Sequence, residues 1–452
     1  MAISGLKRVL GLPEVSFIAV GMTIGGGIFV FTGIVLKITG PALPVAYALA
    51  VVPVFLSMLP LAMLGSAIPV TGGNYMYPSR MVSPRLAFVG IWIYALATFF
   101  GQIPLYSIAC ARYVKVFVPD MPEILFATAL ITFFCIINVL GVKLAAQIQG
   151  VMVLLLVAAL VFFSVNGLVP INPEHFENIF QKGSGNLFLG VALLTFTYLG
   201  SNGIIELGDE IKDPGRVIPR SYFIAFPIIT VIYLGVALAT VNAVPWQGLV
   251  DVPEPLIAVG KSTMGRAGLY FFVLAGAVLA LTTTLNALFM MATKSMMVIT
   301  RDGLLPKSLG IVNRRFGTAH ILFLAVWIIS MIGVLSGLSL ETFASYAAMG
   351  GILVFIPVLL ASLALPRRFP KQYRDAAFKL KGFWRFLCPI VGMGMAIFFC
   401  LVILADLKSP VKIALFVLFI LSGFAYYEAR KRFLLKRGFD IEKIIKNDDW
   451  MK

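Results

Sequence analysis

Charged side chains are scarce in this sequence of 452 residues, because Asp, Glu, Lys and Arg together make up only 12% of it. Soluble globular domains carry about twice that share. In their place, 60% of the residues are hydrophobic and the mean hydropathy is +0.98. The composition therefore excludes an ordinary soluble protein.

Residues that serve metal, redox and hydrolytic chemistry are few as well. The four cysteines all lie in apolar segments without metal-like spacing, so we interpret them as small packing residues. The two histidines, His175 and His320, are expected to be structural. A GxxxxGK[ST] loop is missing, which argues against ATP hydrolysis. With no nucleophile–base pair and no metal cluster in the pattern, the sequence does not predict an enzyme.

Long apolar segments dominate what is present, and about 20 such residues are enough to cross a bilayer. They predict an all-α integral membrane protein with about twelve transmembrane helices in one domain, 1–452. The twelve segments lie near 16–38, 43–66, 86–114, 123–141, 146–167, 187–208, 221–242, 268–298, 319–338, 342–365, 386–407 and 411–429.

The net charge of +16 could indicate nucleic acid, but the placement of the basic residues argues for a membrane instead. With both termini on one side, twelve spans put 28 basic residues on that side and 8 on the other. The protein is expected in the cytoplasmic membrane of the cell. By the positive-inside rule, both of its termini are expected on the cytoplasmic side. A basic tail at about 430–452 is expected to lie against anionic lipid.

Two of the apolar segments are interrupted by glycine, at Gly25-Gly26-Gly27 and at Gly200-Ser201-Asn202-Gly203. Irregular backbone at membrane depth is tolerated only where it lines a cavity inside the protein. The breaks lie in the first and sixth spans, which enter the membrane from opposite sides. They therefore predict a secondary transporter built from a 5+5 inverted repeat, at about 10–168 and 186–366, with additional helices at about 385–430.

Four motifs stand in order along the chain: GMTIGGGIF (21–29), PVTGGNYMYPSR (69–80), GDEIKDPGRVIPR (208–220) and RDGLLP (301–306). Together they resemble the amino acid–polyamine–organocation (APC) superfamily of amino acid permeases, over roughly residues 10 to 430. The resemblance implies the LeuT fold and transport of amino acids or related amines by alternating access.

The two breaks are also the predicted substrate site. Unpaired N–H groups at the first break suit a carboxylate, and freed carbonyls at the second suit an ammonium group. The alternative is close helix packing through small residues. For Tyr94, Gln102 and Tyr106 in the third span, interhelical hydrogen bonding is an equally open interpretation. The predicted substrate-binding residues are Thr23, Ile24, Gly25, Gly26, Gly27, Tyr94, Gln102, Tyr198, Gly200, Ser201, Asn202 and Gly203.

Substrate class stays open at this point. Related permeases often carry Gly-Phe-Glu or Gly-Phe-Asp where this chain has Gly200-Ser201-Asn202. The departure removes a negative charge from the expected wall of the pocket.

A cation site is predicted beside the first break. Ala280, Thr283 and Thr284 share one face of the eighth span, and oxygen ligands of this kind suit sodium. The pattern resembles the second sodium site of LeuT-fold symporters, which implies carbonyl ligands at Gly21 and Ile24. Threonines in membrane helices also bond back to their own backbone, and that alternative remains open.

Two further residues bear on coupling. The resemblance places Leu156 where many proton-coupled or exchanging permeases carry a lysine, so that the site needs either another cation or none. Glu206 is a lone acidic residue near the middle of the sixth span, and such residues are functional candidates by default. It either accepts a proton or holds a cationic substrate, or it lies near the cytoplasmic interface and bonds a neighbour.

The function expected from the sequence is amino acid symport coupled to a cation, with sodium favoured over the proton. An amino acid or polyamine exchanger is the alternative within the class. A transport-inactive nutrient sensor is the alternative from another class. The expected partners are the substrate and the lipid bilayer, with no nucleic acid and no cofactor other than a sodium ion; the sequence gives no oligomeric state.

Overall fold

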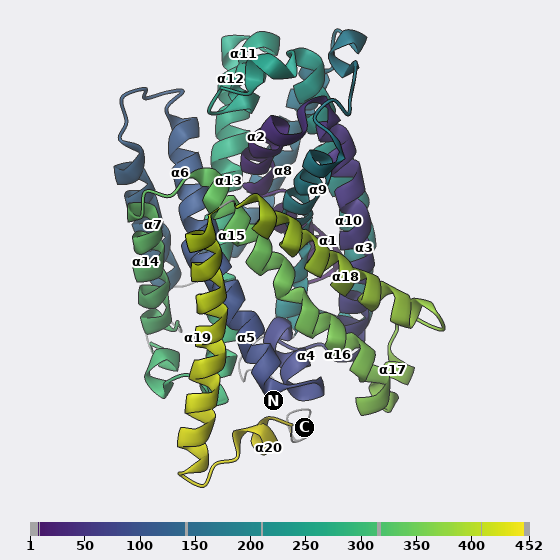
Figure 1. The fold of residues 1–452 in the computed structure, drawn as a ribbon, viewed down its shortest axis with the longest axis vertical. Helices are drawn as coiled ribbons and strands as arrows, with labels where there is room; N and C mark the ends of the chain where they lie inside the picture. The colour runs from purple at the N-terminus through teal and green to yellow at the C-terminus, as the bar shows by residue number, and fades with distance from the viewer. Residues whose placement is uncertain are drawn as a thin grey trace.

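The chain forms a bundle of helices in the computed structural model, which describes residues 8, 10–140, 143–208, 211–313, 318–407 and 409–446. Within those ranges the extended pairing is limited to two isolated bridges, Leu10 with Ile211 and Thr71 with Leu207. Figure 1 shows α20 (Ile441–Lys446) at one end of the bundle, here called the α20 end, and α11 (Pro255–Thr263) at the opposite end, the α11 end.

The first half of the chain supplies two short helices in place of the first span, followed by longer ones. Its elements are α1 (Leu12–Thr23), α2 (Gly27–Thr39), α3 (Leu43–Ala67), α4 (Gly73–Met81), α5 (Pro84–Ala95), the π-helical segment η2 (Leu96–Gln102), α6 (Ile103–Val114), α7 (Glu123–Leu140) and α8 (Lys143–Gly167).

The second half begins with an α-helix that narrows into a 3₁₀ segment. Its elements are α9 (Ser184–Tyr198), the 3₁₀ segment η4 (Leu199–Glu206), α10 (Pro214–Ala243), α11, α12 (Arg266–Phe271), the π-helical segment η7 (Phe272–Val278), α13 (Leu279–Arg301), α14 (His320–Leu335), α15 (Leu340–Leu353), α16 (Phe355–Arg368), α17 (Pro370–Asp375), α18 (Trp384–Asp406), α19 (Pro410–Leu435) and α20.

The helices confirm the all-α membrane class. Eight helical stretches among the described residues are long and apolar enough to cross a bilayer, and the first of them, Leu12–Ala67, covers two predicted spans. Shorter apolar helices occupy three more predicted spans, at Glu123–Val139, Met152–Gly167 and His320–Leu335. The count of twelve and the inverted repeat stay predictions.

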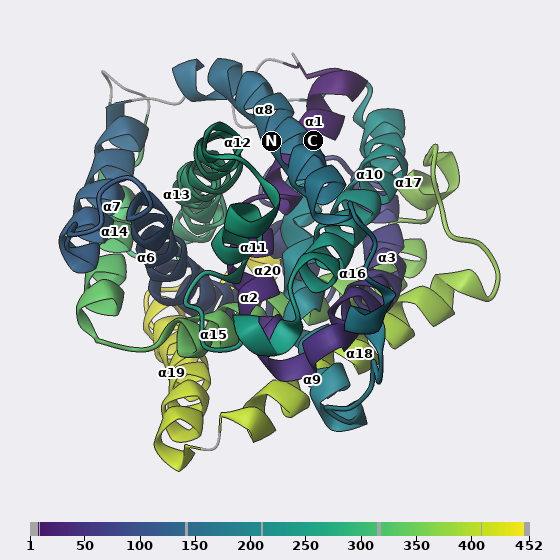
Figure 2. The same cartoon turned by 90° about the horizontal axis from the view of Figure 1, so that it is seen from above.

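The outer helices present apolar side chains where a soluble protein would carry charge. Val231, Leu335 and Val411 are each about two-thirds or more exposed. Seen from above, α2 lies near the centre of the bundle, whereas α7, α14 and α19 lie at its edge (Figure 2). An apolar outer surface around a packed interior is the arrangement that lipid stabilises.

Two helices contain a wide turn. The π segments η2 and η7 each span seven residues, the first between α5 and α6 and the second between α12 and α13. π turns are rare and are often found at functional sites. They fall in the predicted third and eighth spans, which are the corresponding spans of the two proposed repeats.

The basic stretch ARKRFLLKR belongs largely to the last turns of α19, after which the chain reverses into α20. Ile441 and Ile445 of α20 are buried, and the Lys431 ammonium lies 2.8 Å from the Glu442 carboxylate. Arg430 Nε donates to the Gly303 carbonyl at 2.9 Å. Apolar burial and the Lys431–Glu442 pair hold α20 against the end of the bundle, while the Arg430 bond fixes the end of α19 (Figure 1).

Replacing Ile445 by Asp should release α20. Burial of an isoleucine contributes about 1.5–3 kcal/mol, so the released fraction should rise by roughly ten- to a hundredfold. Trypsin cleavage at the exposed Lys436 and Arg437 measures this release. Ile444 is 56% exposed and is the matched control, since its replacement by Asp should leave the rate unchanged. Equal cleavage rates in both variants would show that α20 is not held by its apolar face.

Candidate functional site

A cavity of about 80 Å³ lies where the helix breaks meet. It is bounded by α1, α2, α5, η2, α6, α9, η4, α13, α15 and α16. Its lining residues are Gly21, Met22, Thr23, Gly25, Gly26, Gly27, Tyr94, Gln102, Tyr106, Phe196, Thr197, Leu199, Gly200, Asn202, Gly203, Thr283, Thr284, Ala287, Leu288, Gly351 and Phe355. None of these side chains is charged.

The two breaks touch each other. A Cβ atom on Gly200 would lie 2.3 Å from the Met22 carbonyl oxygen and 2.6 Å from Thr23 Cα, which is closer than any real contact. Only glycine therefore permits this approach of one backbone to the other. The Tyr233 hydroxyl lies 2.5 Å from the Thr23 carbonyl oxygen and 3.2 Å from that of Thr197, so it bridges the ends of both α-helices.

The first break exposes backbone donors to the cavity. α1 ends at Thr23 and α2 begins at Gly27. The first backbone hydrogen bond of α2 runs from the Val30 amide to the Gly26 carbonyl. A helix leaves the amides of its first turn without partners inside the helix, and here the Gly26 amide donates to the Thr284 hydroxyl instead. They lie at the positive end of the α2 dipole, which favours a carboxylate at this place.

The second break takes a different form from the first. The α-helix ends at Tyr198 and the chain continues as a 3₁₀ helix through Glu206, rather than unwinding and restarting as an α-helix. The predicted free carbonyls are partly paired here, because the Leu199 amide donates to the Phe196 carbonyl and the Tyr233 hydroxyl donates to that of Thr197. This end of α9 is the negative end of its dipole, which favours an ammonium group.

Most of the predicted substrate residues line the cavity, and three do not. Ile24 is fully buried without lining it. The Tyr198 hydroxyl donates to the Tyr47 carbonyl at 3.2 Å, on the far side of α9. The buried Ser201 hydroxyl lies 4.0 Å from the sulfur of Met58. The lining members are Thr23, Gly25, Gly26, Gly27, Tyr94, Gln102, Gly200, Asn202 and Gly203.

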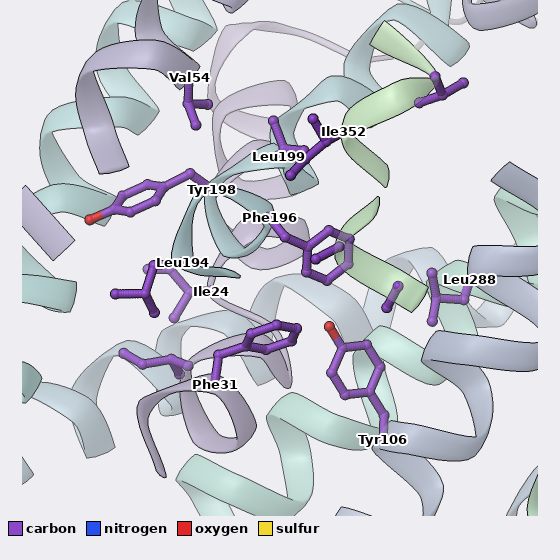
Figure 3. Close-up of a cluster of buried hydrophobic side chains, with 14 of the residues drawn as sticks. Ile24, Phe31, Val54, Tyr106, Leu194, Phe196, Tyr198, Leu199, Leu288 and Ile352 are labelled. Carbon is purple, nitrogen blue, oxygen red and sulfur yellow. The ribbon is translucent and has the colours of Figure 1, made fainter. Parts of the chain in front are cut away.

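An apolar part of the cavity wall was missed by the sequence reasoning. Phe196 comes from α9, Leu288 from α13 and Phe355 from the start of α16. Figure 3 shows Phe196 and Tyr106 on facing sides of one space, with Leu288 beside it. The signal that could have pointed here is the pair Gly350-Gly351 in the tenth predicted span. A Cβ on Gly351 would lie 2.6 Å from the Phe196 ring, so glycine admits that ring.

The predicted cation residues gather next to the first break. The Thr284 hydroxyl donates to the Ala280 carbonyl at 2.7 Å and accepts the Gly26 amide at 2.8 Å, while Thr283 donates to Ala280 at 3.0 Å. Gly21 lines the same cavity, whereas Ala280 and Ile24 lie behind it. Both hydroxyls keep lone pairs for a cation, although each also makes the back-bond expected of a membrane threonine.

Leu156 is buried and does not line the cavity, and its place facing the cation site stays a prediction. A leucine supplies neither charge nor a donor there. In the part of the chain that the structure describes, no group of three His, Cys, Asp or Glu side chains is placed to hold a metal. Among the described residues that line the cavity near the break, the oxygens on offer are those of hydroxyls and carbonyls, which suit a hard monovalent cation.

Glu206 is buried outside the cavity lining, at the end of η4. Its Oε1 accepts the backbone amide of Asn74 at 3.0 Å, and its Oε2 accepts the hydroxyl of Ser295 at 3.0 Å. Asn74 is the second residue of α4, whose N-cap is Gly72 and therefore has no capping side chain. The Glu206 carboxylate supplies this cap from another element.

A buried ion pair ties α4 to the loop after α13. Arg80 Nη1 and Nη2 donate to the two oxygens of Asp302 at 2.7 and 2.8 Å, and the Tyr75 hydroxyl donates to the same carboxylate at 2.6 Å. Bidentate Arg–carboxylate pairs are strong and directional. The motifs PVTGGNYMYPSR and RDGLLP are therefore joined by these hydrogen bonds at the α20 end.

At the α11 end, Glu254 precedes α11 and faces several charged groups. Burial raises the pKa of its carboxyl to about 8, against the lowering effects of Arg112 and of a hydrogen bond with Tyr113. Glu123 raises the pKa further and Lys37 lowers it. The Tyr113 hydroxyl also donates to the Phe29 carbonyl of α2 at 3.1 Å. Tyr113 thus links Glu254, which precedes α11, to α2 of the broken helix.

Stability of the purified protein should fall as the pH rises from about 4.5 to about 8 and should level off above that pH. Above its ordinary pKa this carboxyl ionises in the unfolded chain while the folded protein still holds the proton, so stability falls until both states are ionised. Glu254→Gln cannot ionise, so its melting temperature should stay flat relative to that of the parent between about pH 5 and pH 8. A parallel decline in both proteins would assign the pH dependence to another group.

Comparison with known proteins places this arrangement among transporters. The family model described as "Amino acid permease" matches residues 10–426. The branched-chain amino acid permease BcaP of Bacillus subtilis (strain 168) is 26% identical over 444 residues, covering 93% of this chain and 92% of that protein. The methylthioribose transporter of the same organism is 26% identical over 418 residues, with 87% and 88% covered. The mitochondrial cationic amino acid transporter 3 of Arabidopsis thaliana is 26% identical over 336 residues, with 69% and 54% covered.

Proposed function

Because the chain belongs to the amino acid permease family, a family of membrane transporters and not of enzymes, we propose that it carries an amino acid zwitterion across the cell membrane. The proposed mechanism is secondary active transport by alternating access, with the α20 end in the cytoplasm. The proposed substrate is a neutral amino acid with an apolar side chain, and the proposed coupling ion is sodium.

The observation that carries this proposal is the contact between Gly200 and the first break beside the cavity. It brings the positive end of α2 and the negative end of α9 to one small space. An amino acid carries a carboxylate and an ammonium group on one carbon atom, so it can match two helix ends of opposite charge that face one small cavity. A ligand with only one of these charges would leave one end unmatched.

The neutral substrate follows from the rest of the wall. The lining holds Phe196, Leu288 and Phe355 but no carboxylate that would pair with a cationic side chain. A buried unpaired charge is costly, so lysine or arginine is disfavoured here. Among the relatives compared, this favours the substrate named for the branched-chain permease over that of the cationic transporter.

Sodium is supported by the Thr283 and Thr284 hydroxyls next to the broken helix and by Leu156 in place of a fixed ammonium. Proton coupling is the second candidate, and the observation that favours it is the buried carboxyl of Glu206. Protonation there would remove the carboxylate that caps α4.

Uptake into proteoliposomes tests the proposal. Radiolabelled leucine should accumulate against its gradient when sodium is outside, and much less when choline replaces sodium at the same membrane potential. Lysine should compete poorly. Accumulation that needs only a pH gradient would shift the coupling ion to the proton. Exchange without net accumulation would indicate an exchanger, and binding without either would indicate a sensor.

A further inference from the structure

Asn202 stands between the cavity and α4. It lines the cavity and is 7% exposed, and its Nδ2 donates to Oδ1 of Asn74 at 3.1 Å. Its own Oδ1 is buried and has no protein partner. Buried carbonyl oxygens are nearly always paired, so an unpaired one in a cavity wall indicates a place for a donor from a ligand.

Asn74 is held from two sides at once. Its side chain accepts the Asn202 amide, and its backbone amide donates to Glu206, which in turn accepts the Ser295 hydroxyl. All four residues are at most 7% exposed. The chain of hydrogen bonds therefore runs without interruption by solvent from the cavity through η4 and α4 to α13.

The same short helix carries the ion pair at the α20 end. Tyr75 and Arg80 of α4 both bond Asp302, at the C-terminal end of α13. Gly72, the N-cap of α4, has a left-handed conformation with φ of +75°, and a Cβ there would lie 3.1 Å from Val298. A shift of α4 would thus break the Asp302 contacts and uncover the buried Val298 side chain.

We propose that Asn74 is a positioning residue that couples occupation of the cavity to the hold of α4 on the α20 end. This inference rests on the proposed transport of an amino acid. When a ligand ammonium donates to Asn202 Oδ1, it holds the side-chain amide of Asn202 in the orientation in which Nδ2 donates to Asn74. When the cavity is empty, that amide can turn, and the link from the cavity to α4 is lost while α4 keeps its hydrogen bonds with Glu206 and Asp302.

A cysteine at Val298 reports on the position of α4. The four native cysteines are buried, so a membrane-impermeant thiol reagent added at the α20 end should label the Val298→Cys protein at this position. Labelling is measured with and without leucine in the Val298→Cys parent, in Val298→Cys with Asn74→Ala, and in a control with Asn166→Ala. The Asn166 amide bonds only its own helix, at the Phe162 carbonyl.

Leucine should change the labelling rate of the parent and of the Asn166 control by at least about fivefold, which is a typical allosteric coupling. With Asn74→Ala the ratio should approach one, while leucine binding changes little. A merely structural role would alter basal labelling but keep the leucine ratio. Asn74→Ser, which is too short to meet the Asn202 amide, should give the same loss if Asn74→Ala does not fold.

Two results would overturn the inference alone: a parent that accumulates leucine without any leucine effect on labelling, or an Asn74→Ala variant that keeps the full effect. A parent that neither binds nor accumulates any amino acid would overturn the proposed function, and the inference with it.

Discussion

Replacing Gly200 by alanine should reduce uptake to background, although the change adds a single methyl group. That methyl would meet the Met22 carbonyl oxygen at 2.3 Å and Thr23 Cα at 2.6 Å, both of them backbone atoms that cannot rotate away. Overpacking of this kind costs about 1–3 kcal/mol, and here the strain falls on the contact between the two breaks. Initial rates of leucine uptake in proteoliposomes measure the loss.

Gly185→Ala is the matched control. It lies in the first turn of α9, the same helix, and a Cβ there would meet nothing within 4 Å. Its uptake should equal that of the parent, and both variants should reach the membrane in similar amounts. Normal uptake with Gly200→Ala would show that the two breaks need not touch, and the assignment of the site would fail.

Replacing Thr284 by valine should have the second largest effect. Valine keeps the shape of threonine but removes the hydroxyl that accepts the Gly26 amide, leaving a donor at the first break without its partner. It also removes one proposed sodium ligand. We expect a loss of at least about tenfold in uptake, equal to 1.4 kcal/mol, with a weaker dependence on sodium concentration.

Thr283→Val and Thr282→Val separate the two causes. Thr283 makes no bond to Gly26 but lines the cavity, so its replacement should weaken the response to sodium alone. Thr282 bonds back to Val278 and Leu279 and does not line the cavity, so its replacement should leave uptake and sodium response unchanged. Unaltered sodium dependence in both Thr283→Val and Thr284→Val would remove the proposed ion site.

The features that the sequence predicts well are those with a local physical cause. Glycine interrupts an apolar helix through its own backbone freedom, so the ends of α1 and α9 fall close to the predicted breaks. Apolar length decides where a chain can cross lipid, and the described helices follow the predicted segments. The 3₁₀ continuation at η4 was not predicted, because its narrowing depends on the close approach of α1.

The direction in which a side chain points depends on how its helix is rotated about its axis, and the sequence did not determine that rotation. Tyr198 and Asn202 both adjoin the second break, yet Tyr198 points to Tyr47 while Asn202 lines the cavity. The partners of Glu206 come from α4 and α13, which are distant in sequence. The hydrogen bonds that surround Glu206 could be found only once the fold brought those helices together.

The wide turns η2 and η7 have a consequence for which residues can reach a ligand. Each residue of an α-helix advances by about 100°, so one extra residue in a turn carries everything after it to another side. Tyr106 follows η2, and Thr283 and Thr284 follow η7. One extra residue in each helix is therefore enough to change which hydroxyl groups face the cavity, even if every side chain after it stays the same.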